Sequence, residues 1–151
     1  MLAARLRARC PSARVIGRAE ATGFHLTFDK IGQDGSGKAT LVRGDGVVPG
    51  VLFDLAAEDV HLLDRIEGLG RGYDRVMLDL GGQGVMAYLA PAPFRDAGMR
   101  AFDWYLALVL AGARQADLPA EWVARLAAEP AIPDPEPGRP RRIEALALLA
   151  G

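Results

Sequence analysis

One carboxylate stands out among the residues that can do chemistry, in the stretch LDRIEGLGRGYDR, residues 63–75. Residues 55–67 predict a helix, because apolar side chains recur there at helical spacing and Gly68 follows as a stop signal. At about 100° per residue, the apolar residues cover an arc of about 160°, and Glu67 projects inside that arc. We therefore expect a carboxyl group that points toward the core from the last turn of a helix.

Two effects would raise the pKa of Glu67 at such a position, namely burial and the negative end of the helix dipole. A carboxyl group whose pKa approaches neutrality suits general acid/base catalysis. The alternative is a frayed last turn in which Glu67 bends into water, as most charges at helix ends do. Periodicity alone leaves both interpretations open.

The composition of the 151 residues, half of them hydrophobic and a quarter charged, is that of one globular domain. The net charge of −1 provides no overall field that would recruit nucleic acid or an anionic membrane. A single cysteine, Cys10, excludes an intrachain disulfide framework and a cysteine-rich zinc site. Together with the absence of an apolar run long enough to span a membrane, this predicts a cytoplasmic protein.

The order of predicted elements indicates an α+β fold. A short helix over residues 2–9 is followed by strands, with 13–21 and 24–31 joined through Gly23, and with 39–42 and 47–55 separated by a turn at residues 44–46. After the helix that carries Glu67, residues 73–80 and 84–90 form a hairpin through Gly81 and Gly82. Helices over 99–116, 119–129 and 141–151 complete the chain, the last after a proline-rich connector. We expect about six strands in a small barrel or curled sheet with helices against it.

Three other patterns carry little functional signal. The loop GQDGSGKAT resembles a P-loop through Gly32, Gly37 and Lys38, but Ala39 replaces the magnesium-binding hydroxyl and a strand follows, so a hairpin loop is expected. The arginines between residues 5 and 18 do not share one helical stripe and lack interleaved aromatic residues, which favours a solvated face. His25 and His61 have no partners at metal-ligand spacing, so no metal site is predicted.

Several segments together resemble gamma-glutamylcyclotransferases, in order from residue 2 to about residue 128. They are ARLRARCPSARVIGRA, DGSGKATL, GVLFDL, LDRIEG with the glycine and tyrosine at 72 and 73, and DWYLALVLAGARQADLPAEWVARL. The resemblance implies a domain over residues 1–128, with residues 129–151 as a proline-rich connector and a short C-terminal helix outside it. It also implies a small mixed β-barrel of about six strands with flanking helices.

The activity that the resemblance implies is cleavage of a γ-glutamyl amide to 5-oxoproline and a free amine or amino acid, without a cofactor. Glu67 precedes the glycine of LDRIEG and matches the catalytic glutamate of the family. The substrate's own α-amino group attacks its γ-carbonyl, which agrees with the absence of a Ser/His/Asp or Cys/His pairing in the sequence. The expected partner is a small γ-glutamyl molecule, rather than nucleic acid or a membrane.

The three tyrosines of the chain, Tyr73, Tyr88 and Tyr105, fall where this family places tyrosines around its pocket. A phenol hydroxyl there would hold the carboxylate or amine of the substrate, whereas the alternative is an ordinary buried tyrosine with a backbone partner. The family also carries a YGSN motif on a first strand, and its backbone amides hold the glutamyl group. Met1 and Leu2 stand directly after the place of that motif, so we count them among the predicted substrate-binding residues.

On this resemblance, we expect the place of the YGSN strand and loop to lie before Met1. The strands next to a missing one would have unpaired backbone groups, which predicts lower stability or pairing with a second copy, a homodimer. Two alternatives to an enzyme stay open. One is a binding module that keeps the pocket without turnover, and the other is an interaction protein that uses the apolar helix from Phe102 to Ala113.

Overall fold

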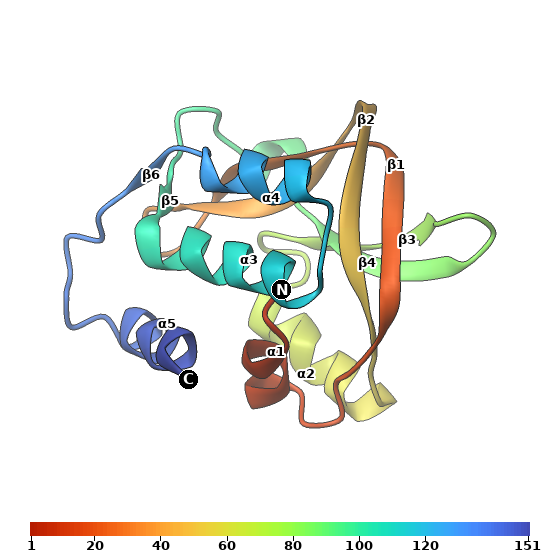
Figure 1. The fold of residues 1–151 in the computed structure, drawn as a ribbon, viewed down its shortest axis with the longest axis horizontal. Coiled ribbons are helices and arrows are strands. Elements are labelled where there is room, and N and C mark those ends of the chain that lie inside the picture. Colours follow the sequence, from red (N-terminus) through yellow and green to blue (C-terminus); the bar gives the residue numbers. More distant parts are fainter.

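The computed structural model describes residues 1–151 and shows an α+β fold built around two long, curved strands (Figure 1). The elements in chain order are α1 (Ala3–Arg9), β1 (Arg14–Ile31), β2 (Gly37–Asp54), α2 (Ala57–Glu67), β3 (Asp74–Asp79), β4 (Gly84–Leu89), the short 3₁₀ helix η1 (Ala92–Phe94), β5 (Ala101–Phe102), α3 (Asp103–Gln115), α4 (Ala120–Ala127), β6 (Ala131–Ile132) and α5 (Pro140–Ala150). The predicted α+β class is confirmed. None of these helices has the length and apolar character needed to cross a membrane.

The predicted barrel is wrong in one respect, because the strands do not form a closed ladder. They form three two-stranded sheets, of which β1–β2 and β3–β4 are antiparallel and β5–β6 is parallel. Where the β1–β2 and β3–β4 sheets approach each other, a side chain of β2 connects them. The N–H of Ala90, directly after β4, donates to Oγ1 of Thr40 over 2.8 Å. The curvature of the long strands is therefore not completed by backbone pairing around a ring.

The predicted breaks in the first half of the chain are also corrected. Residues 14–31 form one strand and residues 37–54 another, and Gly23 lies at a register shift between Thr22 and Phe24 rather than in a turn. Gly46 lies within β2 and not in a turn, and a glycine is needed there because a Cβ would lie 2.6 Å from Nδ1 of His25. The glycines around Asp45 leave room for this imidazole, which lies 3.0 Å from the Asp45 carboxylate.

Other local predictions are confirmed. The loop after β1 is a hairpin connection, closed by a hydrogen bond from the Gly32 N–H to the Ser36 carbonyl, and it opens a strand as expected. The β3–β4 hairpin turns through Gly81 and Gly82, both with positive φ. Such angles cost glycine little, which is why the sequence marks the turn.

The main core lies between the β1–β2 ribbon and the helices α3 and α4, which run side by side over it (Figure 1). Its buried side chains come from both long strands, from β3 and from both helices, and they include Phe24, Phe28, Leu78, Leu106, Trp122 and Leu126. A second cluster joins α3 to the C-terminal helix α5 through Trp104, Leu108 and Ala145. The predicted C-terminal helix is therefore packed against the domain rather than detached from it.

Candidate active site

Glu67 is the last residue of α2, and the chain stops the helix there by the expected means. Gly68 adopts a left-handed conformation with φ of 70°, and the Leu69 N–H returns to the Asp64 carbonyl over 2.9 Å. The start of α2 is fixed by Ser12, whose hydroxyl and N–H both donate to Oδ2 of Asp59. Both ends of the helix are thus held, and Glu67 has a defined position.

The side chain of Glu67 is mostly buried, with 19% of its surface exposed, and Oε1 lies 4.0 Å from Nη1 of Arg9. Burial raises the pKa of this carboxyl group above its ordinary value of 4.5, and the charge of Arg9 opposes this effect. Arg5, Lys30 and Arg141 also lower the pKa, but burial prevails. The observed environment is the one expected for a carboxyl group inside the apolar arc, and not the frayed alternative.

Two of the three tyrosines converge on one peptide of β2. The Tyr73 hydroxyl donates to the Ala39 carbonyl over 2.7 Å, and the Tyr105 hydroxyl accepts from the Ala39 N–H over 3.1 Å. Ala39 lies where two residues of β1, Phe28 and Asp29, stand opposite one residue of β2. Burial is the main cause of the raised pKa of both phenols, and the charge of Glu67 raises both further.

The three tyrosines differ in whether their hydroxyl group donates or accepts a hydrogen bond within the chain. Tyr73 uses its only hydroxyl proton on Ala39, and Tyr88 uses its proton on Oδ1 of Asp64, over 2.6 Å. Tyr105 accepts at Ala39 and makes no hydrogen bond as a donor within the chain. Tyr105 is therefore the tyrosine with a proton left to offer a ligand.

Tyr88 serves a different part of the molecule. Its ring packs near Leu6, Cys10, Ala13 and Leu63, and its bond to Asp64 ties β4 to the middle of α2. Arg75 donates to the other oxygen of Asp64 over 3.0 Å. These contacts indicate a structural function for Tyr88, although the charge of Glu67 still contributes to raising its pKa.

Two lysines on the long strands, Lys30 of β1 and Lys38 of β2, lie near the rings of Tyr73 and Tyr105. The Lys30 ammonium lies 4.9 Å from the centre of the Tyr73 ring, and a Cβ at Gly72 would lie 3.1 Å from Lys30 Nζ. The glycine before Tyr73 therefore leaves room for this cation. Lys38 lies 4.9 Å from the Tyr105 ring, but its charge is matched by Asp34, 2.8 Å away.

The sequence did not identify the cations around Glu67 as site residues. Arg5 and Arg9 are four residues apart on α1, so they share one face of that helix. The prediction that the N-terminal arginines form a solvated face was wrong for this pair. Arg5 is 7% exposed and its guanidinium lies 5.9 Å from the ring centres of both Trp104 and Tyr105. The four-residue spacing was the available signal, whereas nothing in the sequence pointed to Arg141.

The predicted binding residues Met1 and Leu2 precede α1, and Leu2 lies in a cluster against which Tyr105 also packs. Leu2 is buried with Trp104 and Leu108 in the cluster between α3 and α5. Met1 lines a hollow of about 280 Å³ together with Ala3 and Arg7. Residues 3 and 7 lie about 160° around the helix from residues 5 and 9, so this hollow is on the far side of α1 from Glu67. Substrate binding by Met1 and Leu2 stays a prediction.

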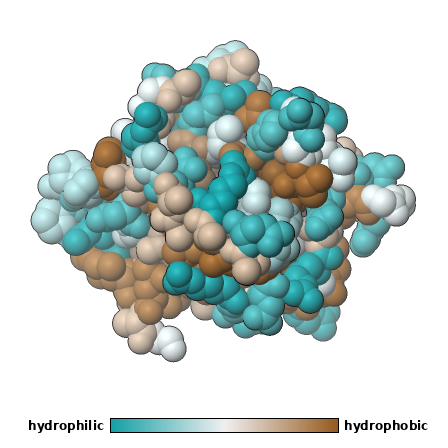
Figure 2. Space-filling model, turned by 45° about the horizontal axis from the view of Figure 1, so that its top comes forward, coloured by the Kyte–Doolittle hydropathy of each residue, from teal (hydrophilic) through white to brown (hydrophobic).

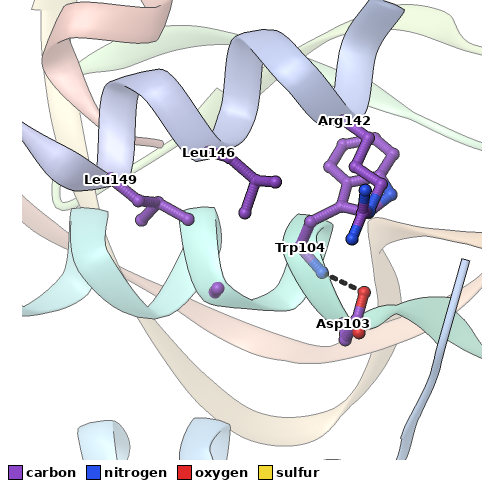
Figure 3. A pocket seen from close by; sticks show the side chains of 6 residues that line it. Asp103, Trp104, Arg142, Leu146 and Leu149 are labelled. Carbon is purple, nitrogen blue, oxygen red and sulfur yellow. Dashed lines mark hydrogen bonds between the residues drawn. The ribbon is translucent and has the colours of Figure 1, made fainter. Parts of the chain in front are cut away.

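A second hollow, of about 230 Å³, lies between α3 and α5 (Figure 3). Figure 3 shows Arg142, Leu146 and Leu149 of α5 pointing toward α3, where Asp103, Trp104 and Ala107 complete the lining. Glu67 lines neither hollow. No group of three or more His, Cys, Asp or Glu side chains is placed to hold a metal ion.

Comparisons with solved structures found several chains with a similar fold. The solved structure of an uncharacterized human protein, loc79017, matches 97% of this chain and 92% of its own with a TM-score of 0.80 and 22% identity. A protein described as gamma-glutamyl cyclotransferase matches 99% of this chain and 93% of its own, with a TM-score of 0.78 and 22% identity. YkqA from Bacillus subtilis, at 19% identity and a TM-score of 0.64, matches 85% of this chain and 49% of its own.

These structural matches show a shared fold. The curated proteins that were compared give no match. The family model described as gamma-glutamyl cyclotransferase, AIG2-like, matches residues 3–106, which include Glu67 and all three tyrosines. The chain therefore belongs to the AIG2-like gamma-glutamyl cyclotransferase family.

Proposed function

We propose that the protein converts a γ-glutamyl amide or γ-glutamyl amino acid to 5-oxoproline and the free amine or amino acid. The observation that carries this proposal is the buried carboxyl group of Glu67, whose pKa is raised at the end of α2, in a chain of this family. Its neighbours Tyr73 and Tyr105 are anchored on a single peptide of β2, so they hold fixed positions beside it. The function needs no cofactor.

The reaction is an internal acyl transfer. Glu67 takes a proton from the α-ammonium group of the substrate, and the freed amine attacks the γ-carbonyl carbon to form a five-membered ring. The protonated Glu67 then delivers that proton to the leaving nitrogen as the original amide bond breaks. The ring nitrogen loses its second proton as the lactam forms, and Glu67 passes this proton to the expelled amine, which leaves as an ammonium ion. One carboxyl group can do both steps when its pKa is raised, because it then holds a proton more readily in the intermediate.

The negative oxygen that develops on the γ-carbonyl requires a hydrogen-bond donor or a positive charge nearby. The free hydroxyl proton of Tyr105 and the ammonium group of Lys30, whose charge acts on Glu67, are suitable groups for this purpose. Burial lowers the pKa of Lys30, while the charge of Glu67 raises it. We assign Tyr105 to substrate orientation, and Tyr73 to holding the Ala39 peptide in place.

The test compares Glu67→Gln with Glu58→Gln, an exposed glutamate on the same helix. Release of 5-oxoproline and of free amine is measured over a panel of γ-glutamyl amino acids and γ-glutamyl alkylamides. Glu67→Gln should lower kcat by about a hundredfold or more, the usual scale for a general acid/base, while Glu58→Gln should not. Near wild-type turnover in Glu67→Gln would refute the mechanism, and ligand binding without any turnover in the wild type would indicate a binding module instead.

A further inference from the structure

The surroundings of Glu67 hold more positive than negative charge. Arg5 and Arg9 from α1, Lys30 from β1 and Arg141 from α5 all act electrostatically on Glu67. Two further carboxylates act on these cations: Asp34, which is already paired with Lys38 at 2.8 Å, and Glu144, which makes no ion pair with them. Of the four cations, Arg9 alone has a carboxylate partner within 4.0 Å, namely Glu67 itself. Arg5, Lys30 and Arg141 therefore act on the proposed catalytic carboxylate without an ion-pair partner of their own.

Arg5 is the most unusual of these cations. Only 7% of it is exposed, and its Nε is buried without a hydrogen-bond partner. A buried guanidinium without a carboxylate partner is unfavourable, because the lost hydration is not replaced. Glu144 of α5 acts on it from a distance and makes no ion pair with it, and contact with the rings of Trp104 and Tyr105 compensates only in part. An anionic group from outside the chain would complete this environment.

Arg141 reaches the same region from the far end of the chain. It is the second residue of α5 and is exposed, and its charge acts on Arg5, Lys30, Lys38 and Glu67, which belong to four different elements. The geometry agrees, since α5 contacts α1, the helix that carries Arg5, and Arg139, two residues before Arg141, lies 5.4 Å from the same Phe102 ring that Lys38 approaches to 5.6 Å. Figure 3 shows its neighbour Arg142 directed toward α3 instead.

The fold holds this arginine in place on both sides of residue 141. Asp134, which has no exposed side-chain surface, accepts hydrogen bonds from Trp104 and Arg139, both over 2.8 Å. Further along α5, Ala145 is buried against the α3 cluster. Figure 2 shows brown, apolar side chains at the lower left, in the region of α5, where Ile143 and Leu146 are exposed. The inward face of α5 is therefore fixed while residue 141 remains accessible.

We propose that Arg5 and Arg141 form a carboxylate-binding subsite next to Glu67, so that the C-terminal helix, which lies outside residues 3–106, completes the site. A guanidinium group matches a planar carboxylate with two parallel hydrogen bonds. A γ-glutamyl amino acid offers two carboxylates, one on the glutamyl group and one on the leaving amino acid, whereas a γ-glutamyl alkylamide offers only the first. The assignment to a substrate carboxylate rests on the proposed function.

The first experiment measures steady-state kinetics of Arg141→Ala, with Arg142→Ala as the control on the adjacent residue. Arg141→Ala should raise KM for γ-glutamylalanine about tenfold or more, with kcat little changed, and Arg141→Lys should recover part of the loss. If KM for γ-glutamylethylamide rises equally, the subsite holds the glutamyl carboxylate. If only γ-glutamylalanine is affected, it holds the carboxylate of the leaving amino acid. Unchanged KM for both substrates overturns the proposal.

The second experiment does not depend on turnover. Calorimetric titration of Glu67→Gln with γ-glutamylalanine should show binding that Arg141→Ala or Arg5→Gln, added to this background, weakens about tenfold or more. Binding that depends on these arginines in a protein whose wild type has no cyclotransferase activity would refute the proposed function but support the subsite. Equal binding with and without Arg141, or no binding to Glu67→Gln, refutes the subsite. Because Arg141 is exposed, its variant tests the proposal even if Arg5→Gln does not fold.

Discussion

The Asp134 carboxylate links the C-terminal segment to Trp104 of α3. The substitution Asp134→Asn tests how much this contact contributes to stability. The carboxylate accepts from Trp104 Nε1 and Arg139 Nε at 2.8 Å each, and from the Glu136 N–H at 2.9 Å. An asparagine has only one oxygen, so its NH₂ group must face a donor. Arg139 Nη2 also donates to Asp134, over 3.2 Å, so each carboxylate oxygen accepts two hydrogen bonds. The substitution therefore removes the charge and leaves two hydrogen bonds unmade.

The magnitude follows from the pKa of Asp134. Hydrogen bonding from Arg139 is the main cause that lowers it from its ordinary value of 3.8 to about 2. At about 1.4 kcal/mol per pH unit, this difference corresponds to about 2 kcal/mol, as an upper value because Arg139 is partly exposed and screened by solvent. For a chain of this size, about 2 kcal/mol corresponds to a fall in Tm of about 4–8 °C.

The lowered pKa of Asp134 also predicts how the stability difference between the two proteins depends on pH. A carboxylate whose folded-state pKa is depressed contributes stability above its unfolded pKa and loses it as pH falls through the folded one. The difference in stability between wild type and Asp134→Asn should therefore be constant near neutral pH and shrink as pH falls from 3.8 to about 2.

The assay is thermal and urea denaturation at several pH values. Glu136→Gln is the control, because Glu136 contacts the same arginine at 3.1 Å but has 60% of its side chain exposed. A surface pair of this kind contributes about 0–1 kcal/mol, so the control should change little. Equal Tm values for Asp134→Asn and wild type at neutral pH, or a difference that grows toward pH 2, would refute the reasoning.

Two further predictions concern the site itself. Because burial raises the pKa of Glu67 above 4.5, wild-type stability should decline as pH rises from 4.5 through the folded-state pKa. Glu67→Gln should lack this decline. Urea denaturation at several pH values checks this, and a variant that loses more stability than wild type over that range would contradict it. Tyr73→Phe should lower stability by about 1–2 kcal/mol, since it leaves the Ala39 carbonyl without its donor, whereas Tyr105→Phe should lower turnover more than stability. Calorimetry and 5-oxoproline release on both variants check this pair, and the reverse order would exclude the assigned functions.

The sequence by itself determined the local features that depend on near neighbours in the chain. The helix that ends at Glu67 was predictable, because its apolar spacing and the glycine after it are local properties. The hairpin through Gly81 and Gly82 was predictable for the same reason. The position of Glu67 inside the apolar arc made it a site candidate on spacing alone, and the family resemblance added its expected function.

Only the tertiary structure decided features that depend on what lies opposite. Gly46 leaves room for the ring of His25 from the neighbouring strand, so it does not turn the chain, and this cannot be read from its own surroundings in the sequence. Three tyrosines look alike in the sequence, yet the partners of their hydroxyl groups leave only Tyr105 with a free proton.

The same holds for the charges around Glu67. Arg5 and Arg141 come from opposite ends of the chain and are brought toward one carboxylate by the packing of α1 and α5 against α3. Sequence periodicity carries information over a few residues, because it reflects the geometry of one helix or strand. Burial, the choice of hydrogen-bond partner and the sum of nearby charges arise only when distant elements pack, so the structure alone assigned them.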